Sequence, residues 1–186
     1  MNESFAVRIV GDPVLREVAQ DVEDIDASLV STTESMLDTM YAEPGIGLAA
    51  PQVGIKRRFF VYDVGDGPET LVNPRIVESE GSWTYQEGCL SVPGLFWDLV
   101  RPKKVHMVGY DLDGNEVSIE ADELLARLFQ HEMDHLNGVL LLDHLEEDQR
   151  KEAMKTLRER QIDKHTKEIL GTDSFDEDGP GGLSLP

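Results

Sequence analysis

The strongest chemical signal in the sequence is the segment from His131 to His135, which reads His-Glu-Met-Asp-His. Two histidines four positions apart lie on one face of a helix, so both imidazole rings can reach a single metal ion. Glu132, between them, projects close enough to contact a water molecule on that ion without ligating the metal. The pattern therefore predicts a catalytic metal site, in preference to two structural histidines whose ring nitrogens are bound within the protein.

A catalytic metal site also needs a third protein ligand and an open position for water. In the metallopeptidases that share this motif, the third ligand is a histidine or a glutamate downstream of the helix. Four downstream residues fit that description: His144, Glu146, Glu147 and His165. Upstream, Cys89 offers a thiolate, and Gly88 before it allows backbone to come close. We regard Cys89 as the better ligand, although spacing alone excludes none of the others.

The two histidines are expected on a helix that begins after Asp122 as its N-cap and runs to about Asn137, with Gly138 past its end. Two stripes at helical spacing begin with leucine and continue with histidine or glutamate: Leu124, Leu128, His131 and His135, and beside them Leu125, Glu132 and Leu136. Polar groups on a core-facing stripe need partners. This helix is therefore expected to bury reactive polar side chains as well as apolar ones.

The elements that must position this helix indicate a fold of the α+β class, with short antiparallel strands around a central metal-binding helix. Helical spacing of apolar residues predicts an N-terminal helix over 26–43 and a C-terminal helix over 145–170. Strands are expected over 57–64, 71–77, 103–112 and 115–121. Asp113-Gly114 is a hairpin turn signal between the last two, and Pro74 favours an edge or a bulge in the second.

Length and composition predict one domain over residues 1–170 and an acidic Gly/Pro-rich tail over 171–186 that we expect to be mobile. Hydrophobic residues make up 40% of the chain, which excludes a disordered polymer, and one cysteine excludes an internal disulfide. The net charge of −20 repels nucleic-acid phosphates and anionic lipid. With no signal peptide or membrane-spanning run visible, we expect a cytoplasmic protein that binds neither nucleic acid nor membrane.

A third segment, Gly45 to Gln52, reads Gly-Ile-Gly-Leu-Ala-Ala-Pro-Gln, and its small residues leave room for the backbone of a ligand. Taken alone, it is typical of the end of a helix followed by a turn. Together with segments 87–91 and 130–135, it resembles the three motifs of the peptide deformylase family, in the same order. Segment 8–15 is similar to that family's usual opening, so the resemblance covers roughly residues 5 to 150.

The resemblance implies a metal-dependent hydrolase that removes the formyl group from the N-terminal formylmethionine of newly made polypeptides and releases formate. Its implied metal ligands are Cys89, His131 and His135, with Glu132 as the catalytic acid and base. Gln52 and the backbone N–H of Leu90 are implied to stabilise the oxyanion. The metal commonly used by the family is Fe²⁺, with Zn²⁺ or Ni²⁺ in some preparations. The implied partners are N-formylmethionyl peptides and nascent chains.

The same resemblance predicts a substrate groove. Backbone at Gly45 and Gly47 is expected to pair with the substrate as an added strand. A methionine pocket and its surroundings are expected from four further residues: Ile46, Glu87, Leu125 and Leu128. Many family members have an arginine in the groove seven residues after the cysteine, where this chain has Phe96. The sequence leaves open whether Arg101, five residues further on, takes its place.

Two alternatives remain at this level. The first is a metallopeptidase, which would keep His131, Glu132 and His135 but take its third ligand downstream, so that Cys89 would be dispensable for metal binding. The second is a non-catalytic module stabilised by a metal ion, which would need a fourth protein ligand and no open position. The sequence offers no convincing fourth ligand near the motif.

Overall fold

The structure is a computed structural model that describes residues 4–170, and the tail predicted over 171–186 lies outside this range. Within it, the α-helices are α1 (Ala27–Ala42), α2 (Glu123–Leu136) and α3 (Glu147–Leu170), and short 3-10 helices span Pro13–Arg16, Ala50–Val53 and Leu141–His144. The strands are β1 (Gly47–Ala49), β2 (Phe59–Tyr62), β3 (Glu69–Glu80), β4 (Trp83–Cys89), β5 (Val92–Arg101), β6 (Lys104–Tyr110) and β7 (Glu116–Asp122). None of the helices in the described range is long and apolar enough to cross a membrane.

The elements up to Leu145 form one compact unit, and α3 belongs to a second unit that begins at Glu146. In the first unit, an antiparallel sheet has the strand order β1-β2-β3-β6-β7, and β4 and β5 form a separate hairpin. The α+β class predicted from the sequence is confirmed. The helix α3 shows two ion pairs between side chains one turn apart, from Lys151 to Glu147 and from Lys155 to Glu159.

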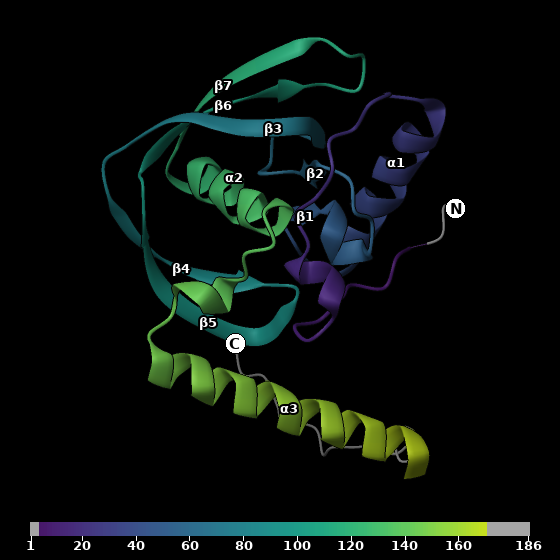
Figure 1. The fold of residues 1–186 in the computed structure, drawn as a ribbon, viewed down its shortest axis with the longest axis vertical. Coiled ribbons are helices and arrows are strands. Elements are labelled where there is room, and N and C mark those ends of the chain that lie inside the picture. The colour runs from purple at the N-terminus through teal and green to yellow at the C-terminus, as the bar shows by residue number, and fades with distance from the viewer. Residues whose placement is uncertain (1–3, 171–186) are drawn as a thin grey trace, which may run out of the picture. The chain divides into compact units, whose positions relative to one another are not determined.

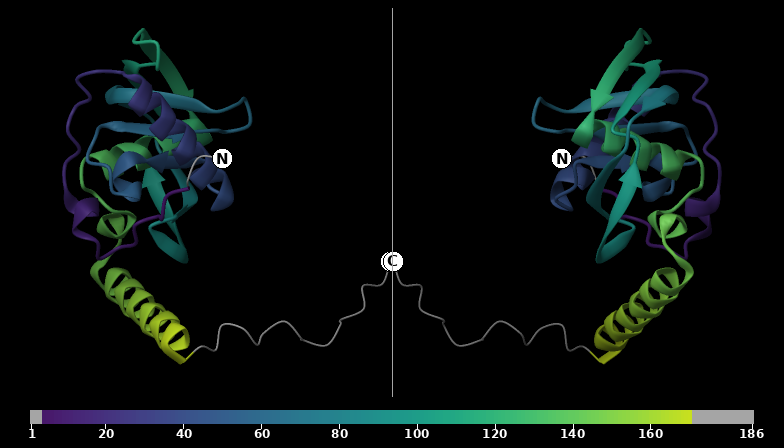
Figure 2. Two further views of the ribbon diagram at one scale, coloured as in Figure 1. Left: turned by 90° about the vertical axis from the view of Figure 1, so that its right-hand side faces the viewer. Right: turned by 90° about the vertical axis from the view of Figure 1, so that its left-hand side faces the viewer.

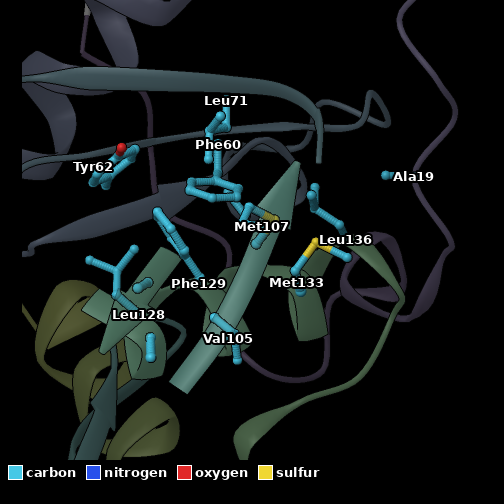
Figure 3. Packing of buried hydrophobic residues seen from close by; sticks show 13 residues of the cluster. Ala19, Phe60, Tyr62, Leu71, Val105, Met107, Leu128, Phe129, Met133 and Leu136 are labelled. Atoms are coloured by element: carbon cyan, nitrogen blue, oxygen red, sulfur yellow. The ribbon is translucent and has the colours of Figure 1, made fainter. Parts of the chain in front are cut away.

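The five-stranded sheet lies between α1 and α2 (Figures 1 and 2). Alternate residues of β2 point to opposite faces, so Phe59 packs in the cluster with α1 while Phe60 packs in the cluster with α2. On the α2 side, the rings of Phe60 and Tyr62 approach Phe129 of the helix with centroid distances of 5.9 and 5.2 Å (Figure 3). This packing makes α2 the central element of the first unit.

The helix α2 begins and ends as its sequence predicts. The side chain of Asp122 accepts a hydrogen bond from the backbone N–H of Glu123, which caps the start. Gly138 follows the end at φ +71°, and a Cβ there would lie 2.6 Å from the carbonyl oxygen of Arg16, so no other residue fits. One expectation is wrong: Leu124, placed on a core-facing stripe, is 42% exposed because the first turn of the helix extends beyond the packed cluster.

The hairpin of β4 and β5 was not predicted, because the segment before Cys89 has the composition of a Gly/Ser-rich loop. Its pairing runs in register from Trp83 opposite Arg101 to Gly88 opposite Phe96, and then slips, so that Cys89 faces Val92. Such irregularities re-aim a side chain at the end of a ladder. Cys89 is the last residue of β4, next to the turn into β5. The β4–β5 hairpin lies on the side of α2 away from the five-stranded sheet (Figure 1).

Candidate metal centre and active-site cleft

Three side chains from two elements converge on one point. The Sγ atom of Cys89, at the end of β4, lies 3.3 Å from Nε2 of His135, which lies 3.3 Å from Nε2 of His131. All three atoms fall within 4.8 Å of one another, and in residues 4–170 no other histidine, cysteine and carboxylate group meets this criterion. Two donors on a common tetrahedral ion are separated by about 3.3–3.7 Å, so the three residues fit a divalent metal.

The two imidazole rings favour the ionised form of the neighbouring thiol of Cys89. Burial acts to raise the pKa of Cys89, but the neighbouring His135 and His131 lower that pKa well below its usual value. The thiolate is the form that binds metals. A soft thiolate with two imidazoles is a donor set that suits zinc, iron or nickel better than calcium or magnesium.

Glu87 orients the first histidine. Its Oε2 atom lies 3.1 Å from Nδ1 of His131, which leaves the Nε2 atom of that ring facing Cys89 and His135. Burial acts to raise the pKa of Glu87, yet hydrogen bonds from His131 and Arg101 bring it below its usual range, so the carboxylate stays ionised. Carboxylates in this position fix the tautomer of a metal-binding histidine. Since its oxygens are engaged, Glu87 has a structural role beside the cleft.

Two buried arginines complete the network around this carboxylate. Arg101 donates to Glu87 over 2.6 and 3.0 Å, and Arg127 donates to it over 2.5 Å. Arg101 also pairs with Asp134 at 2.9 Å, and Asp134 lies 2.7 Å from Nε2 of His144. Arg101 therefore does not take the place of a groove arginine. His144, one of the four downstream ligand candidates, is bound to Asp134.

Glu132 is 3% exposed, follows His131 in the sequence, and lies close enough to His131 and His135 to be influenced by both rings. Burial raises its pKa to about 7, against the opposing influence of His131 and His135. Its Oε2 atom has no hydrogen-bond partner among the described residues, so it is available to accept from a water molecule. A buried carboxylate that titrates near neutral pH is suited to general acid–base catalysis.

Gln52 is held against the same cluster. Its Oε1 atom accepts a hydrogen bond of 2.8 Å from the backbone N–H of Ala49, and its Nε2 atom donates to Ser91 over 3.3 Å and to the sulfur of Cys89 over 3.8 Å. The side chain is 2% exposed, so its position is well defined. Leu90 follows Cys89, with its side chain packed against the cluster that contains α1.

An open cleft of about 630 Å³ leads to these groups. Its walls include five of the six predicted substrate residues: Gly45, Ile46, Gly47, Glu87 and Leu128. Leu125, also predicted for the methionine pocket, instead packs against the core cluster of α2. The cleft additionally contains residues that the sequence did not single out, among them Tyr85 from β4 and Leu95 from β5.

Comparison with known proteins decides the family. A family model for polypeptide deformylase matches residues 5–151. The chain belongs to the polypeptide deformylase family. Members of this family are metal-dependent hydrolases, and Cys89, His131 and His135 form a cluster that could hold a metal ion. The resemblance noted in the three sequence motifs is thereby confirmed.

Individual relatives agree. The peptide deformylase of Carboxydothermus hydrogenoformans is 48% identical over 139 residues, which are 75% of this chain and 91% of that protein. Among solved structures, the peptide deformylase of Thermotoga maritima is 46% identical with a TM-score of 0.76 and covers 77% of this chain and 99% of its own. The peptide deformylase of Legionella pneumophila is 38% identical with a TM-score of 0.84, and the match covers 87% of this chain and 98% of that one.

Sequence reasoning missed the network of charged residues that holds Glu87 in place, and it considered Arg101 only as a groove residue. Arg101 and Arg127 are buried charged residues on two elements far apart in the chain, β5 and α2, and Asp134 is a half-buried residue inside the histidine motif. Nothing in their local pattern indicates the ion pairs that they form. One signal was available for Arg127, because it lies one helical turn before His131 and so on the same face of α2.

Replacing Arg101 with methionine is expected to lower the free energy of unfolding by about 3–5 kcal/mol, because it leaves the buried Glu87 carboxylate with one partner fewer. Urea denaturation measures this change. Lys56→Met is the matched control, since it breaks an exposed pair with Glu17 and should cost at most about 1 kcal/mol. Equal losses in the two variants would show that the buried network is not important for stability.

Replacement of Gly47 by a larger residue is expected to slow turnover. A Cβ at this position would lie 2.5 Å from Oε1 of Glu132 and 3.3 Å from Leu128, so Gly47→Ala must displace the carboxylate. We expect kcat to fall by about 10-fold or more while the bound metal is retained. Gly45→Ala is the control for kcat, because the closest atom to its Cβ would be the flexible end of Leu90 at 3.0 Å, and the other contacts are at 3.5 Å. A larger loss of kcat in Gly45→Ala would contradict this assignment.

Proposed function

We propose that this protein removes the formyl group from the N-terminal formylmethionine of newly made polypeptides, with Cys89, His131 and His135 as ligands of the metal ion. The observation that carries the proposal is the juxtaposition of three ligand atoms within 4.8 Å and the buried carboxylate of Glu132 beside them. The family defines the reaction class, and this geometry provides the groups that the reaction needs.

The reaction breaks the C–N bond of a formamide by adding water. The bound metal ion would lower the pKa of water from about 15.7 toward 7 and so make hydroxide available at neutral pH. Glu132 accepts a proton from the attacking water and delivers it to the departing amine, so one proton enters and leaves the carboxylate in each cycle. The products are formate and a polypeptide with a free N-terminus.

Charge develops on the formyl oxygen as its carbon becomes tetrahedral. Gln52 is the side-chain donor for this oxygen in our proposal, because its amide nitrogen lies beside Cys89 and its carbonyl is tethered to the backbone of Ala49. The backbone N–H of Leu90 is the second donor. A single donor of this kind typically contributes about 2.7–4 kcal/mol to transition-state stabilisation.

The substrate backbone is proposed to pair along β1, which is an edge strand of the five-stranded sheet. Segment 45–47 lines the cleft and leads into β1, and the side of β1 that is not paired with β2 is proposed to receive the entering peptide. The methionine side chain would then lie against Ile46 and Leu128, which both line the cleft.

We propose Fe²⁺ as the native ion, with Zn²⁺ and Ni²⁺ as substitutes, since thiolate and imidazole ligands accept all three. We also propose that the enzyme works in the cytoplasm, where nascent chains are made, and that residues 1–170 suffice for catalysis, since all three motifs lie within them. A metallopeptidase with a downstream ligand is disfavoured because, among the described residues, the ligand atom that gathers with those of His131 and His135 is the sulfur of Cys89, while His144 is bound to Asp134.

The proposal is tested by measuring formate released from a formylmethionyl peptide by protein reconstituted with Fe²⁺ or with Ni²⁺ in the absence of oxygen. Both forms should release formate, and neither should act on the acetylmethionyl peptide. On exposure to air, the iron form should lose activity while the nickel form persists, because a thiolate next to a ferrous ion is open to oxidation. Hydrolysis of internal peptide bonds instead would favour the metallopeptidase.

A further inference from the structure

Exposed apolar side chains gather around the cleft. Ten large hydrophobic residues among those described are more than one-third exposed, and four of these line the cleft: Ile46, Tyr85, Phe96 and Leu124. They come from four separate parts of the chain: the segment before β1, strands β4 and β5, and the first turn of α2. Exposed apolar groups collected in one place mark a binding surface.

Phe96 is the most exposed of the four, at 60%. Phe96 lies opposite Gly88 in the β4–β5 register, and Gly88 is the residue before the proposed metal ligand Cys89. A Cβ on Gly88 would lie 2.4 and 2.6 Å from two carbons of the Phe96 ring, so the ring covers the backbone of Gly88. The absence of a side chain at residue 88 therefore gives this ring a defined position at the cleft, with most of its surface free.

Arg127 is the arginine that lines the cleft, and its charge is already paired. The terminal nitrogens of Arg127 are engaged with Glu87 and with the carbonyl oxygen of Trp83. Glu43, at the mouth of the cleft, is an exposed carboxylate. A substrate side chain that reaches Phe96 therefore meets an aromatic ring in surroundings that disfavour negative charge.

We infer that Phe96 is a specificity-determining residue, which selects formylmethionyl peptides with an apolar side chain at one of the two positions after methionine. The inference rests on the proposed function and names its substrate class. An extended peptide paired with β1 directs successive side chains to opposite sides, so one of these two positions faces the cleft wall. Peptides with such a side chain bind more tightly because apolar surface of the substrate is buried against the ring of Phe96.

The test compares two peptide series, formyl-Met-X-Ser and formyl-Met-Ala-X, with X as Leu, Phe, Ala, Asp or Lys. In one series, Leu and Phe should give kcat/KM about 10-fold above Ala and Asp, mainly through KM. Phe96→Ala should bring kcat/KM for the Leu and Phe peptides close to that for the Ala peptide, and its metal content should equal that of the parent. The matched control is Val100→Ala, which removes another exposed apolar side chain of β5 and should keep the preference.

The inference is overturned if neither series discriminates, if Lys or Asp is preferred, or if Phe96→Ala keeps the preference. It is equally overturned if Phe96→Ala lowers kcat alike for every peptide, because the ring would then only support the hairpin. A wrong proposed function would give a different result: protein that is fully loaded with metal would release no formate from any of the peptides. Binding of the Leu and Ala peptides to metal-loaded Glu132→Gln, measured by calorimetry, gives the same comparison without turnover.

Discussion

Glu132→Gln is expected to lower kcat for formate release by about 10² or more while the metal content stays that of the parent. Glutamine keeps the shape of the side chain and one acceptor oxygen, but it cannot take up a proton at neutral pH. The three ligand atoms are untouched, and the amide fills the same buried volume beside Gly47. Steady-state kinetics and metal analysis of one preparation measure both quantities.

The control for this variant is Glu123→Gln, which removes the charge of an exposed glutamate at the start of the same helix. Its kcat should remain within a few-fold of the parent. Loss of the metal from Glu132→Gln would make Glu132 a ligand and contradict its role as the base. Full activity of the variant would also contradict it, because another group would then have to accept the proton.

Cys89→Ala is expected to lose most of the bound metal and, with it, formate release. Two imidazoles alone are a poor site for a divalent ion, and the remaining Nε2 atoms of His131 and His135 belong to one helix turn. Metal affinity measured by competition with a chromogenic chelator provides a readout that does not depend on turnover. Circular dichroism verifies that the variant is folded.

His144→Ala is the counterpart that separates the two ligand assignments. His144 is bound to Asp134, so its loss should leave the metal affinity close to that of the parent. Retention of metal in Cys89→Ala together with its loss in His144→Ala would reverse the assignment and favour a metallopeptidase with a downstream third ligand.

The central helix and its chemistry could be predicted because their signals are local. Asp122 as a cap, Gly138 past the end and two histidines one turn apart all lie within 17 consecutive residues. The bulge expected at Pro74 is also confirmed, since the pairing of β3 with β6 shifts register between Val72 and Arg75. Such features depend on the backbone preferences of single residues.

The β4–β5 hairpin could not be predicted in this way. Its strands show little hydrophobic alternation, because β4 has exposed side chains at Thr84, Tyr85 and Gln86 in succession. The partners of Glu87 were hidden for a related reason: Arg101 and Arg127 lie 14 and 40 residues away from it. Long-range pairing of charged groups leaves no local pattern.

The most direct test of the account is X-ray absorption spectroscopy of the zinc-loaded protein, because it reports the atoms that bind the ion. We expect one sulfur at about 2.3 Å and two imidazole nitrogens at about 2.0–2.1 Å, with one further light atom from solvent. This result would place Cys89, His131 and His135 around a single ion with an open position. A first shell without sulfur would contradict the account.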